Sequence, residues 1–301
     1  MKKMSETIVF FGSGPVAAAS LRLLARDFNV DAVVTKPQPE HHKEAFPVLE
    51  LAHELGLKTF TPSNKRELSE LFASRPVSSR LGVVIDYGII INQDVIDYFP
   101  LGIVNSHFSL LPEWRGADPI TFAVLSGQPQ TGVSLMLIVA AMDEGPLLAQ
   151  ATYDMPADIT TPQLTADLID LSYQTLAEIL PAYASGDIVP VEQSTSVLVT
   201  YSRKLSKTDG VLDFTKPATT LEREVRAYLE WPRSRTQING IDVIVTAAHV
   251  APGFSQPGEL YVNGKQLGFY TADGLFIIDR LIPAGKREMP AAAFLAGYKL
   301  D

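Results

Sequence analysis

Short, continuously apolar segments alternate with segments of helical periodicity through the first half of this 301-residue chain. Strands of a parallel sheet are buried on both faces, so they appear in a sequence as uninterrupted apolar runs. Their alternation with helical segments, here at 16–28 and 46–56, is typical of a doubly wound, mostly parallel sheet. The sequence therefore predicts an α/β domain that binds its ligand beyond the carboxyl ends of the strands. The expected strands lie within TIVFFG (7–12), VDAVVT (30–35), LGVVIDYGIII (81–91), GIVNSH (102–107) and TGVSLMLIVAA (131–141).

The last third of the chain has a different pattern. Residues 163–185 carry apolar side chains at helical spacing, which predicts a long helix that closes the first domain. Further on, Asn239-Gly240, Asn263-Gly264 and Asp273-Gly274 separate short apolar runs, and such dipeptides favour tight hairpin turns. We expect a small antiparallel β-barrel after one helix at 219–229. The expected division is a first domain at 1–190, a polar linker at 191–206 and a second domain at 207–301.

Composition places the chain among globular proteins. Hydrophobic residues make up 46% and charged residues 20% of the chain, and no apolar run approaches the roughly 20 residues that a membrane-spanning helix needs. The first residues lack the cleavage pattern of a secretory signal. The chain has no cysteine, which excludes disulfides and fits a reducing compartment. We therefore expect a cytoplasmic protein that does not enter membranes, and we expect it to be a monomer.

Charge is distributed unevenly along the chain. The net charge is −9, yet residues 1–200 carry 12 basic and 23 acidic side chains, whereas residues 201–301 carry 13 and 11. Within 201–240, eight basic side chains outnumber five acidic ones. Such asymmetry indicates an anionic partner for the C-terminal part, and a solvated face of mixed charges is the alternative interpretation.

A glycine-rich turn follows the first apolar run. Gly12, Gly14 and Ala17 have the G-x-G-x-x-A spacing of dinucleotide-binding turns, and Asp31 lies roughly where such sites carry a ribose-binding carboxylate. Pro15, however, removes a backbone donor that could contact a pyrophosphate. Asp31 also precedes the apolar AVVT instead of following it. We therefore favour the alternative, in which the glycines permit a tight turn from strand to helix.

Polar side chains gather at the end of the run GIVNSH. In an extended strand, Asn105 and His107 project to one side and Ser106 to the other. Their position late in the strand places the pair at the expected ligand crevice. Asp143 follows the apolar run TGVSLMLIVAA, and we expect its carboxylate to reach the same edge of the sheet. Asn, His and Asp side chains would then converge.

This trio suits acyl transfer to an amine. An Asn amide can donate a hydrogen bond to the oxyanion of a tetrahedral transition state. A His can move a proton or, when charged, stabilise the oxyanion, and a neighbouring carboxylate favours the charged form and orients the ring. Because the chain has no cysteine nucleophile, transfer without an acyl-enzyme is the simpler interpretation. For His107, a packing or surface role is the alternative interpretation. For Trp114 and Arg115, the sequence favours a packing or surface role as much as a functional one. His41 and His42 adjoin on a polar stretch far from His107, so we expect no metal site.

These residues resemble those of the formyltransferases that use 10-formyltetrahydrofolate. The resemblance is carried by Asn105-x-His107, by SLLP at 109–112 followed by Arg115-Gly116, and by Asp143 with Gly145. Glycinamide ribonucleotide formyltransferases, sugar-nucleotide formyltransferases and the hydrolase part of formyltetrahydrofolate dehydrogenases share this set. The segments at 203–234 and 281–290 are similar to the second domain of the methionyl-tRNA formyltransferases, so the resemblance extends over nearly the whole chain.

The resemblance implies a Rossmann-like catalytic domain followed by a small OB-like β-barrel domain. It implies transfer of a formyl group from 10-formyltetrahydrofolate to the α-amine of methionyl-initiator tRNA, without a metal. Asn105 and His107 would stabilise the formyl oxyanion, and Asp143 would orient His107 and assist deprotonation of the amine. The folate would contact the loop Ser109, Leu110, Leu111 and Pro112, with its pteridine near Tyr87 and Gly88.

A tRNA partner would account for the basic C-terminal third, because Lys and Arg clusters supply salt-dependent affinity for phosphates. One departure from the family is the loop at 36–46, which is shorter and less basic than usual and leaves acceptor recognition open. Another is Phe108, at a position where a small residue is common. The alternatives are a nucleotide-linked amino sugar as acceptor and a non-catalytic folate- or nucleotide-binding module. The candidate tRNA contacts are Lys204, Lys207, Arg223, Arg226, Arg233 and Lys286.

Overall fold

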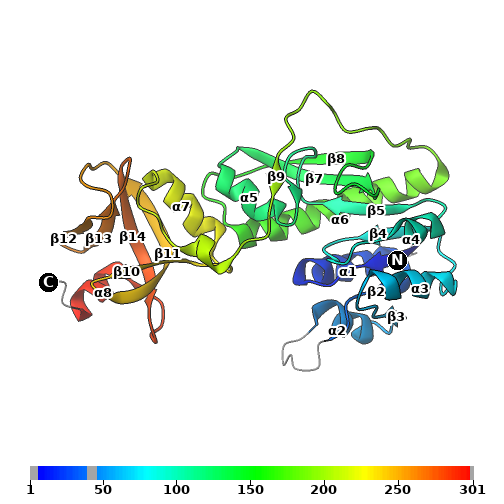
Figure 1. Cartoon of the computed structure of the whole chain (residues 1–301), viewed down its shortest axis with the longest axis horizontal. Coiled ribbons are helices and arrows are strands. Elements are labelled where there is room, and N and C mark those ends of the chain that lie inside the picture. Colours follow the sequence, from blue (N-terminus) through cyan, green and yellow to red (C-terminus); the bar gives the residue numbers. More distant parts are fainter. Residues whose placement is uncertain (1–5, 39–45, 299–301) are drawn as a thin grey trace. The chain divides into compact units, whose positions relative to one another are not determined.

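The computed structural model describes residues 6–38 and 46–298 and divides into two compact units (Figure 1). Of the expected linker, residues 191–202 are counted with unit 1 and residues 203–206 with unit 2. The loop at 36–46, whose short and weakly basic sequence left acceptor recognition open, lies mostly outside the described residues. Unit 1 comprises Met1–Pro119, Gln130–Asp154 and Thr165–Ser202, and unit 2 comprises Ile120–Pro129, Met155–Leu164 and Arg203–Asp301.

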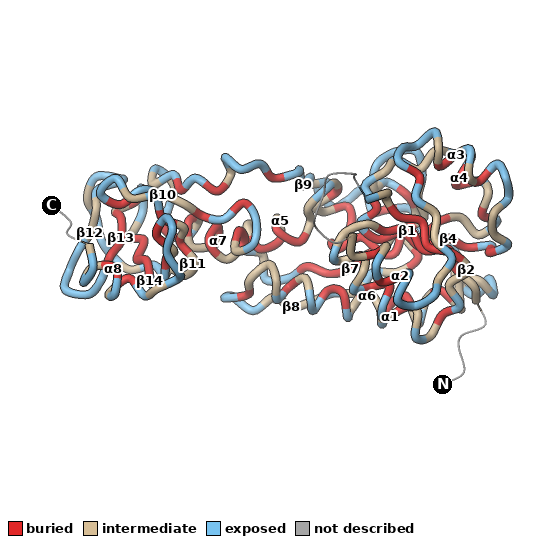
Figure 2. The backbone as a smooth tube through the Cα atoms, turned by 90° about the horizontal axis from the view of Figure 1, so that it is seen from below, coloured by how far each residue is buried: buried red, intermediate tan, exposed pale blue. Residues whose placement is uncertain are grey.

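A seven-stranded sheet forms the centre of unit 1, in the order β3-β2-β1-β4-β5-β7-β8. The neighbours from β3 to β5 are parallel, which confirms the predicted mostly parallel sheet. β7 and β8 are antiparallel to their neighbours. The apolar runs are buried as expected, and Figure 2 shows them as buried segments inside unit 1. The strands are β1 (Thr7–Phe11), β2 (Asn29–Val34), β3 (Thr59–Phe60), β4 (Leu81–Val84), β5 (Ile103–His107), β7 (Gln130–Leu137) and β8 (Leu147–Asp154).

Helices cover both faces of this sheet, as a doubly wound fold requires. On one face, Phe11 of β1 packs in a hydrophobic cluster with Phe72 and Phe99, which lie on or next to α3 and α4. On the other face, the Ser106 hydroxyl of β5 hydrogen-bonds the Ser172 hydroxyl of α6 at 2.7 Å. The helices are α1 (Pro15–Asp27), α2 (Pro47–Glu54), α3 (Lys65–Ala73), α4 (Gln93–Tyr98) and α6 (Thr161–Ser185), which belongs to unit 1 from Thr165 onward.

Two short strands of unit 1 lie outside the main sheet. β6 (Arg115–Gly116) pairs in parallel with β9 (Tyr201–Ser202). β6 belongs to the loop that follows β5, and β9 belongs to the segment expected as a linker. This pairing therefore attaches that segment to the loop that follows the strand carrying Asn105 and His107.

Unit 2 is built on an antiparallel sheet in the order β10-β11-β14-β13-β12, with β15 paired to β14. The predicted turn dipeptides join its strands: Asn239 and Gly240, both with positive φ, connect β10 to β11. This arrangement agrees with the expected small C-terminal β domain of the OB-like class. The elements are α5 (Pro119–Ser126), a 3-10 helix (Lys207–Gly210), α7 (Ala218–Ala227), β10 (Ser234–Ile238), β11 (Ile241–Ala251), β12 (Leu260–Asn263), β13 (Gln266–Tyr270), β14 (Leu275–Pro283), β15 (Met289–Pro290) and α8 (Ala291–Gly297).

Within the ranges 6–38 and 46–298, no helix is long and apolar enough to cross a membrane. Among the same residues, no group of three or more His, Asp or Glu side chains is placed to hold a metal ion.

The core of unit 2 provides a test of the fold with a control of the same residue type. Phe294 of α8 is fully buried in the core of unit 2, whereas Phe254, in the loop after β11, is 92% exposed. Phe294→Ala removes a buried ring and leaves a cavity, so it should lower the free energy of unfolding by about 3 to 5 kcal/mol. Phe254→Ala should change it by less than about 0.5 kcal/mol. Urea denaturation followed by circular dichroism measures both, and equal effects of the two substitutions would contradict this packing.

Candidate active site

Asn105 and His107 project from the same side of β5, as strand alternation predicts. Between them, Ser106 points to the opposite face, where it bonds to Ser172. Asn105 is half-buried, and among the described residues its side-chain amide has no hydrogen-bond partner. A free amide beside a buried histidine leaves two N–H donors available to a ligand.

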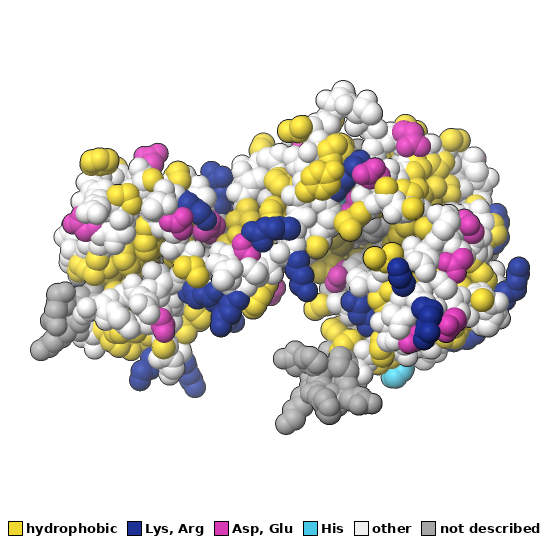
Figure 3. Space-filling view, viewed as in Figure 1, with side chains coloured by type: hydrophobic (Ala, Val, Ile, Leu, Met, Phe, Trp, Pro, Cys, Tyr) yellow, Lys and Arg dark blue, Asp and Glu magenta, His cyan; other side chains and the backbone are white. Residues whose placement is uncertain are grey.

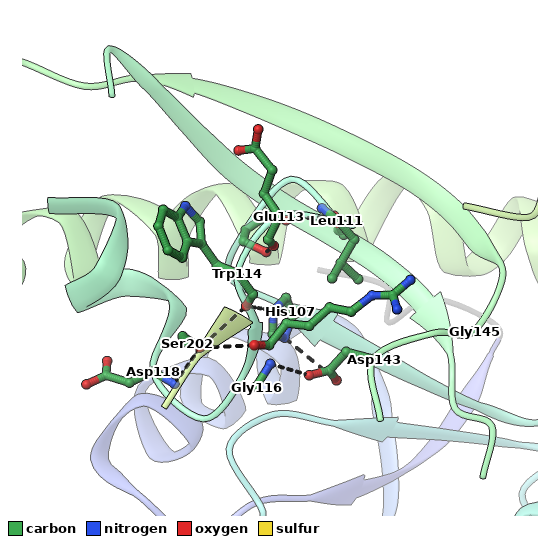
Figure 4. Close-up of polar contacts among 12 residues, drawn as sticks. His107, Leu111, Glu113, Trp114, Gly116, Asp118, Asp143, Gly145 and Ser202 are labelled. Carbon is green, nitrogen blue, oxygen red and sulfur yellow. Dashed lines mark hydrogen bonds and ion pairs between the residues drawn. The ribbon is translucent and has the colours of Figure 1, made fainter. Parts of the chain in front are cut away.

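The surroundings of His107 determine which of its ring nitrogens carries a proton. Nε2 lies 3.0 Å from the Trp114 carbonyl oxygen, and because a carbonyl can only accept, Nε2 must be the donor. Nδ1 lies 3.9 Å from Oδ1 of Asp143. Figure 4 shows the imidazole between these two groups. In the neutral ring, Nδ1 therefore keeps its lone pair and faces the carboxylate.

The charge of His107 is governed by two opposing effects. The side chain is 7% exposed, and this burial lowers the pKa of His107 below its usual value of about 6.5. The Asp143 carboxylate and the Trp114 carbonyl act in the opposite direction, because both stabilise the imidazolium form. Burial is the larger effect, so the imidazole is neutral at neutral pH and can accept a proton at Nδ1.

Asp143 reaches His107 by a route that differs from the one expected. We expected it at the carboxyl end of a parallel strand, but β7 is antiparallel to β5, with Ser134 opposite His107 and Leu137 opposite Val104. β7 therefore runs away from His107 as it approaches its end. The loop at 138–146 returns the carboxylate to His107.

The turn around Asp143 has little freedom. Asp143 has a φ of 54°, in the left-handed region that few non-glycine residues adopt. At Gly145, a Cβ atom would lie 1.7 Å from the Leu137 carbonyl oxygen, so a side chain has no space there. The Gly116 amide donates to Oδ2 of Asp143 at 2.8 Å. This bond leaves Oδ1 as the carboxylate oxygen that faces His107.

A buried polar network that the sequence did not reveal lies behind this turn. The Gln193 side-chain amide donates to the carbonyl oxygens of Asp143 (2.8 Å) and Gly145 (3.0 Å). Its own oxygen accepts from the Arg115 guanidinium at 2.7 Å. Arg115 also forms an ion pair with Glu144 at 3.0 Å, so its contacts serve this turn. All these bonds converge on residues 143–145.

The segment 191–202, which we call the strap, packs against the site. At its start, Val191 and Leu147 exchange backbone hydrogen bonds at 2.7 and 2.8 Å. At its end, the Thr200 hydroxyl accepts from the Trp114 amide at 2.9 Å, and the Thr200 carbonyl accepts from the Arg115 amide at 3.0 Å. Its polar sequence led us to predict a linker, but its backbone is bonded to the loop that follows β5.

The predicted folate loop at 109–112 is held by residues of β7 and β8. The Ser134 hydroxyl donates to the Ser109 carbonyl at 2.6 Å and accepts from the Leu111 amide at 2.9 Å. The Gln150 amide donates to the Leu111 carbonyl at 2.9 Å. Ser109 and Leu111 are buried, and the Ser109 hydroxyl already donates to the Glu113 carbonyl. Leu110 is the residue of this loop whose side chain is partly exposed, while Pro112 is buried.

Tyr87 and Gly88, predicted near the pteridine, follow the end of β4. The Tyr87 ring is 3% exposed and packs edge-on against Phe11 at 5.7 Å between centroids, so it belongs to the core of unit 1. Burial raises the pKa of its hydroxyl. Gly88 is exposed and has a φ of 70°. A ligand at this position would therefore contact the chain at Gly88 and the adjoining backbone, and not the tyrosine ring.

The glycine-rich turn after β1 is shaped by packing. A Cβ atom at Gly14 would lie 2.0 Å from Oδ2 of Asp86, and one at Gly12 would lie 2.6 Å from the Ala17 side chain. Asp31 accepts hydrogen bonds from the Ser79 amide and hydroxyl. The glycines thus admit close neighbours, and Asp31 anchors a loop, which supports the packing interpretation of this motif.

The six candidate tRNA contacts lie in unit 2 and differ in their exposure and in whether an acidic side chain pairs with them. Lys204, Lys207, Arg233 and Lys286 are exposed. Arg226 forms an ion pair with Glu222 and donates to the Ile159 carbonyl, whereas Arg223 makes one bond, to the Ser126 carbonyl. Arg223 and Arg226 line a hollow of about 420 Å³ in unit 2. Figure 3 shows Lys and Arg side chains gathered on the face of unit 2 that it draws.

Comparisons with known proteins agree with the geometry of both units. Residues 7–180 match the Formyl transferase family, and residues 204–299 match the Formyl transferase, C-terminal domain, family. The methionyl-tRNA formyltransferase of Roseiflexus castenholzii is 39% identical over 306 residues, covering 99% of this chain and 97% of the relative. That of Myxococcus xanthus is 37% identical over 298 residues, covering 97% and 95%.

Solved structures show the same fold at low sequence identity. The N-formyltransferase of Helicobacter canadensis, in complex with folinic acid and dTDP-3-aminofucose, has a TM-score of 0.70 at 15% identity, covering 95% of this chain and all of that one. HypX of Aquifex aeolicus, in complex with tetrahydrofolic acid, has a TM-score of 0.64 at 17% identity, covering 96% of this chain and 46% of that one. With both units matched and two relatives above 30% identity over nearly their full length, the chain belongs to the formyltransferase family.

Proposed function

We propose that this protein transfers a formyl group from 10-formyltetrahydrofolate to the α-amine of methionyl-initiator tRNA. The observation that carries the proposal is the convergence of Asn105, His107 and Asp143 in a chain that matches proteins named methionyl-tRNA formyltransferase over nearly its whole length. We also propose that the protein works as a monomer in the cytoplasm, with the chemistry in residues 1–190 and tRNA binding in residues 207–301 and at Lys204 of the preceding segment.

Asn105 has the chemistry of an oxyanion donor. Its amide has no partner among the described residues and lies on the same side of β5 as His107. A donor that is already in place before reaction stabilises the charge that develops on the formyl oxygen, and it needs no reorganisation to do so. Asn105 therefore lowers the barrier to attack by the amine.

His107 and Asp143 act together on the proton that the amine loses. His107 is neutral and its Nδ1 carries a lone pair, so Nδ1 can take this proton as the amine nitrogen bonds to the formyl carbon. The ring then becomes an imidazolium, and its Nδ1–H points to Oδ1 of Asp143, 3.9 Å away in the neutral state. The carboxylate stabilises that charge in a buried site, where Coulombic attraction is strong.

The residues at the carboxyl end of the sheet fit a folate. The exposed Gly88, with its left-handed backbone, and the partly exposed Leu110 leave groups open to a ligand at the two predicted folate positions. We propose that Leu110 and the backbone of 109–112 hold the folate, with the pteridine near Gly88. When bound, the folate would supply the formyl group, and its N10 would take up, as that group leaves, the proton that His107 received from the amine.

Unit 2 supplies the charge for a tRNA. We propose that Lys204, Lys207, Arg233 and Lys286 contact phosphates, because their side chains are exposed. Arg223 contributes from the hollow that it lines, while Arg226 contributes less because Glu222 already neutralises it.

An acceptor assay tests the proposed function. The protein should formylate charged initiator methionyl-tRNA in the presence of 10-formyltetrahydrofolate, and it should leave an amino-sugar nucleotide unmodified. Mass spectrometry of the released amino acid and of the nucleotide measures both reactions. Formyl transfer to the amino sugar, with none to methionyl-tRNA, would contradict the proposal in favour of the alternative acceptor.

Substitutions at β5 test the catalytic roles. Asn105→Ala removes the oxyanion donor and should lower kcat by about 10²- to 10³-fold, and His107→Ala should lower it by about 10²- to 10⁴-fold. The Kd for the folate should change little, because neither side chain is proposed to hold it. His53→Ala, at an exposed histidine of α2, is the control and should keep full turnover. Unchanged kcat in His107→Ala would support the non-catalytic alternative.

The salt dependence of tRNA binding tests the basic surface of unit 2. Each of Lys204→Ala, Lys207→Ala and Arg233→Ala should weaken binding and reduce the slope of log K against log[salt] by roughly 0.7 to 0.9, because each removes one phosphate contact. Lys65→Ala, at an exposed lysine of α3, is the control. Binding isotherms at several salt concentrations give the slopes. A slope that stays the same in all three variants would place the tRNA on another surface.

A further inference from the structure

Asp143 is the one member of the catalytic trio whose position the main sheet does not explain. Asn105 and His107 are fixed by the pairing of β5 with β4 and β7. Asp143 lies six residues past the end of β7, a strand that runs away from His107. Hydrogen bonds from other segments must therefore determine where the carboxylate lies.

The local backbone does not favour this placement by itself. Asp143 has a φ of 54°. This conformation costs a non-glycine residue free energy, so it persists only where the surrounding structure enforces it. The carboxylate has one bond from the backbone, from the Gly116 amide to Oδ2. That bond restrains one carboxylate oxygen, but it does not restrain the main chain of the turn. Another group must hold the main chain.

The main chain of the turn is held by Gln193. One side-chain amide group bonds the carbonyl oxygens of Asp143 and Gly145, so it spans the turn on both sides of Glu144. The amide orientation is fixed by its partners, because the two carbonyls only accept and the Arg115 guanidinium only donates. Gln193 is 9% exposed, so water competes little for these bonds.

Gln193 is itself fixed by the strap. Two residues before it, Val191 exchanges backbone hydrogen bonds with Leu147, at the start of β8. After it, residues 194–199 are exposed, and Thr200 and Tyr201 then attach to the loop after β5. The strap is thus anchored at both ends, and Gln193 is its buried residue between the two anchors.

We propose that Gln193 is a positioning residue, which holds the main chain of Asp143 so that its carboxylate faces Nδ1 of His107. Gln193 contacts no reacting group. It acts through Asp143, and Arg115 supports it by bonding the Gln193 oxygen and the Glu144 carboxylate. The inference rests on the proposed function for its effect on turnover, but its effect on His107 is independent of any substrate.

Displacement of Asp143 has a consequence for His107 with a defined sign. The Asp143 carboxylate is the charged group that raises the pKa of His107 against the effect of burial. When the carboxylate moves away, burial is less opposed and the pKa of His107 falls. Because the neutral ring is the proton acceptor, kcat decreases as the pH drops through the pKa of His107. A lower pKa therefore moves this acid limb of the kcat–pH profile to lower pH. The maximal kcat, at the plateau of the profile, falls as well. If the substitution only reduced the amount of folded protein, the plateau value of kcat would fall, but the acid limb would stay at the same pH.

The test compares three variants of the full chain. Gln193→Met keeps the length and neutrality of the side chain but removes both donors, and it should lower kcat by about 10- to 100-fold with an unchanged KM for the folate. Gln193→Glu keeps an acceptor for Arg115 but still cannot donate to the two carbonyls, so it should lose turnover as well. Glu192→Gln, at the exposed neighbouring residue, is the control and should behave as the unmodified chain does.

The decisive measurement is the titration of His107 by NMR in the absence of any substrate, with Asp143→Asn as the reference for a lost carboxylate charge. In Gln193→Met, the midpoint should fall toward that of Asp143→Asn. A folded Gln193→Met that keeps the midpoint of the unmodified chain would overturn the proposal, even if turnover were reduced. If Gln193→Met does not fold, a Gln193→Glu variant with full kcat overturns it, and one with the expected loss supports it. Failure of the tRNA assay would leave the titration result unaffected, so the two proposals are tested separately.

Discussion

The chemistry of this site depends on the burial of His107 beside Asp143. Burial keeps the imidazole neutral, and the hydrogen bond from Nε2 to the Trp114 carbonyl leaves the Nδ1 lone pair facing the carboxylate. A neutral base whose charged form is stabilised by a fixed neighbour can take a proton during reaction and release it afterwards. The loop after β5, the turn at 143–145 and the strap are arranged around this pair.

Periodicity and residue chemistry predicted the parts of the structure that leave a local signal. The continuous apolar runs became β1, β2, β4, β5 and β7, the turn dipeptides join strands of unit 2, and alternation placed Asn105 and His107 on one side of β5. The helix α3 and the strand β8 leave no such signal. In α3 (KRELSELFA) charged residues interrupt the apolar ones, and β8 buries only one side, so neither has a continuous apolar run.

The remainder of the site could not be predicted because its determinants join segments far apart in the chain. Nothing in the sequence indicates that β7 pairs antiparallel to β5, and this direction decides that Asp143 must return through a loop. Gln193 lies 50 residues from Asp143, in a polar stretch that has the composition of a linker. A single buried amide has no periodicity, so the bond between them is visible only in the fold. In unit 2, likewise, the basic residues were tallied from the sequence without their partners. In the structure, Arg226 forms an ion pair with Glu222.

The protonation of His107 in the unmodified protein tests the central claim most directly. Nitrogen-15 NMR of the histidine side chains distinguishes a protonated ring nitrogen from one that carries a lone pair. At pH 7, we expect His107 to be neutral, with the proton on Nε2 and the lone pair on Nδ1. A proton on Nδ1, in either the other neutral tautomer or the imidazolium, would contradict the role of His107 as the acceptor of the amine proton.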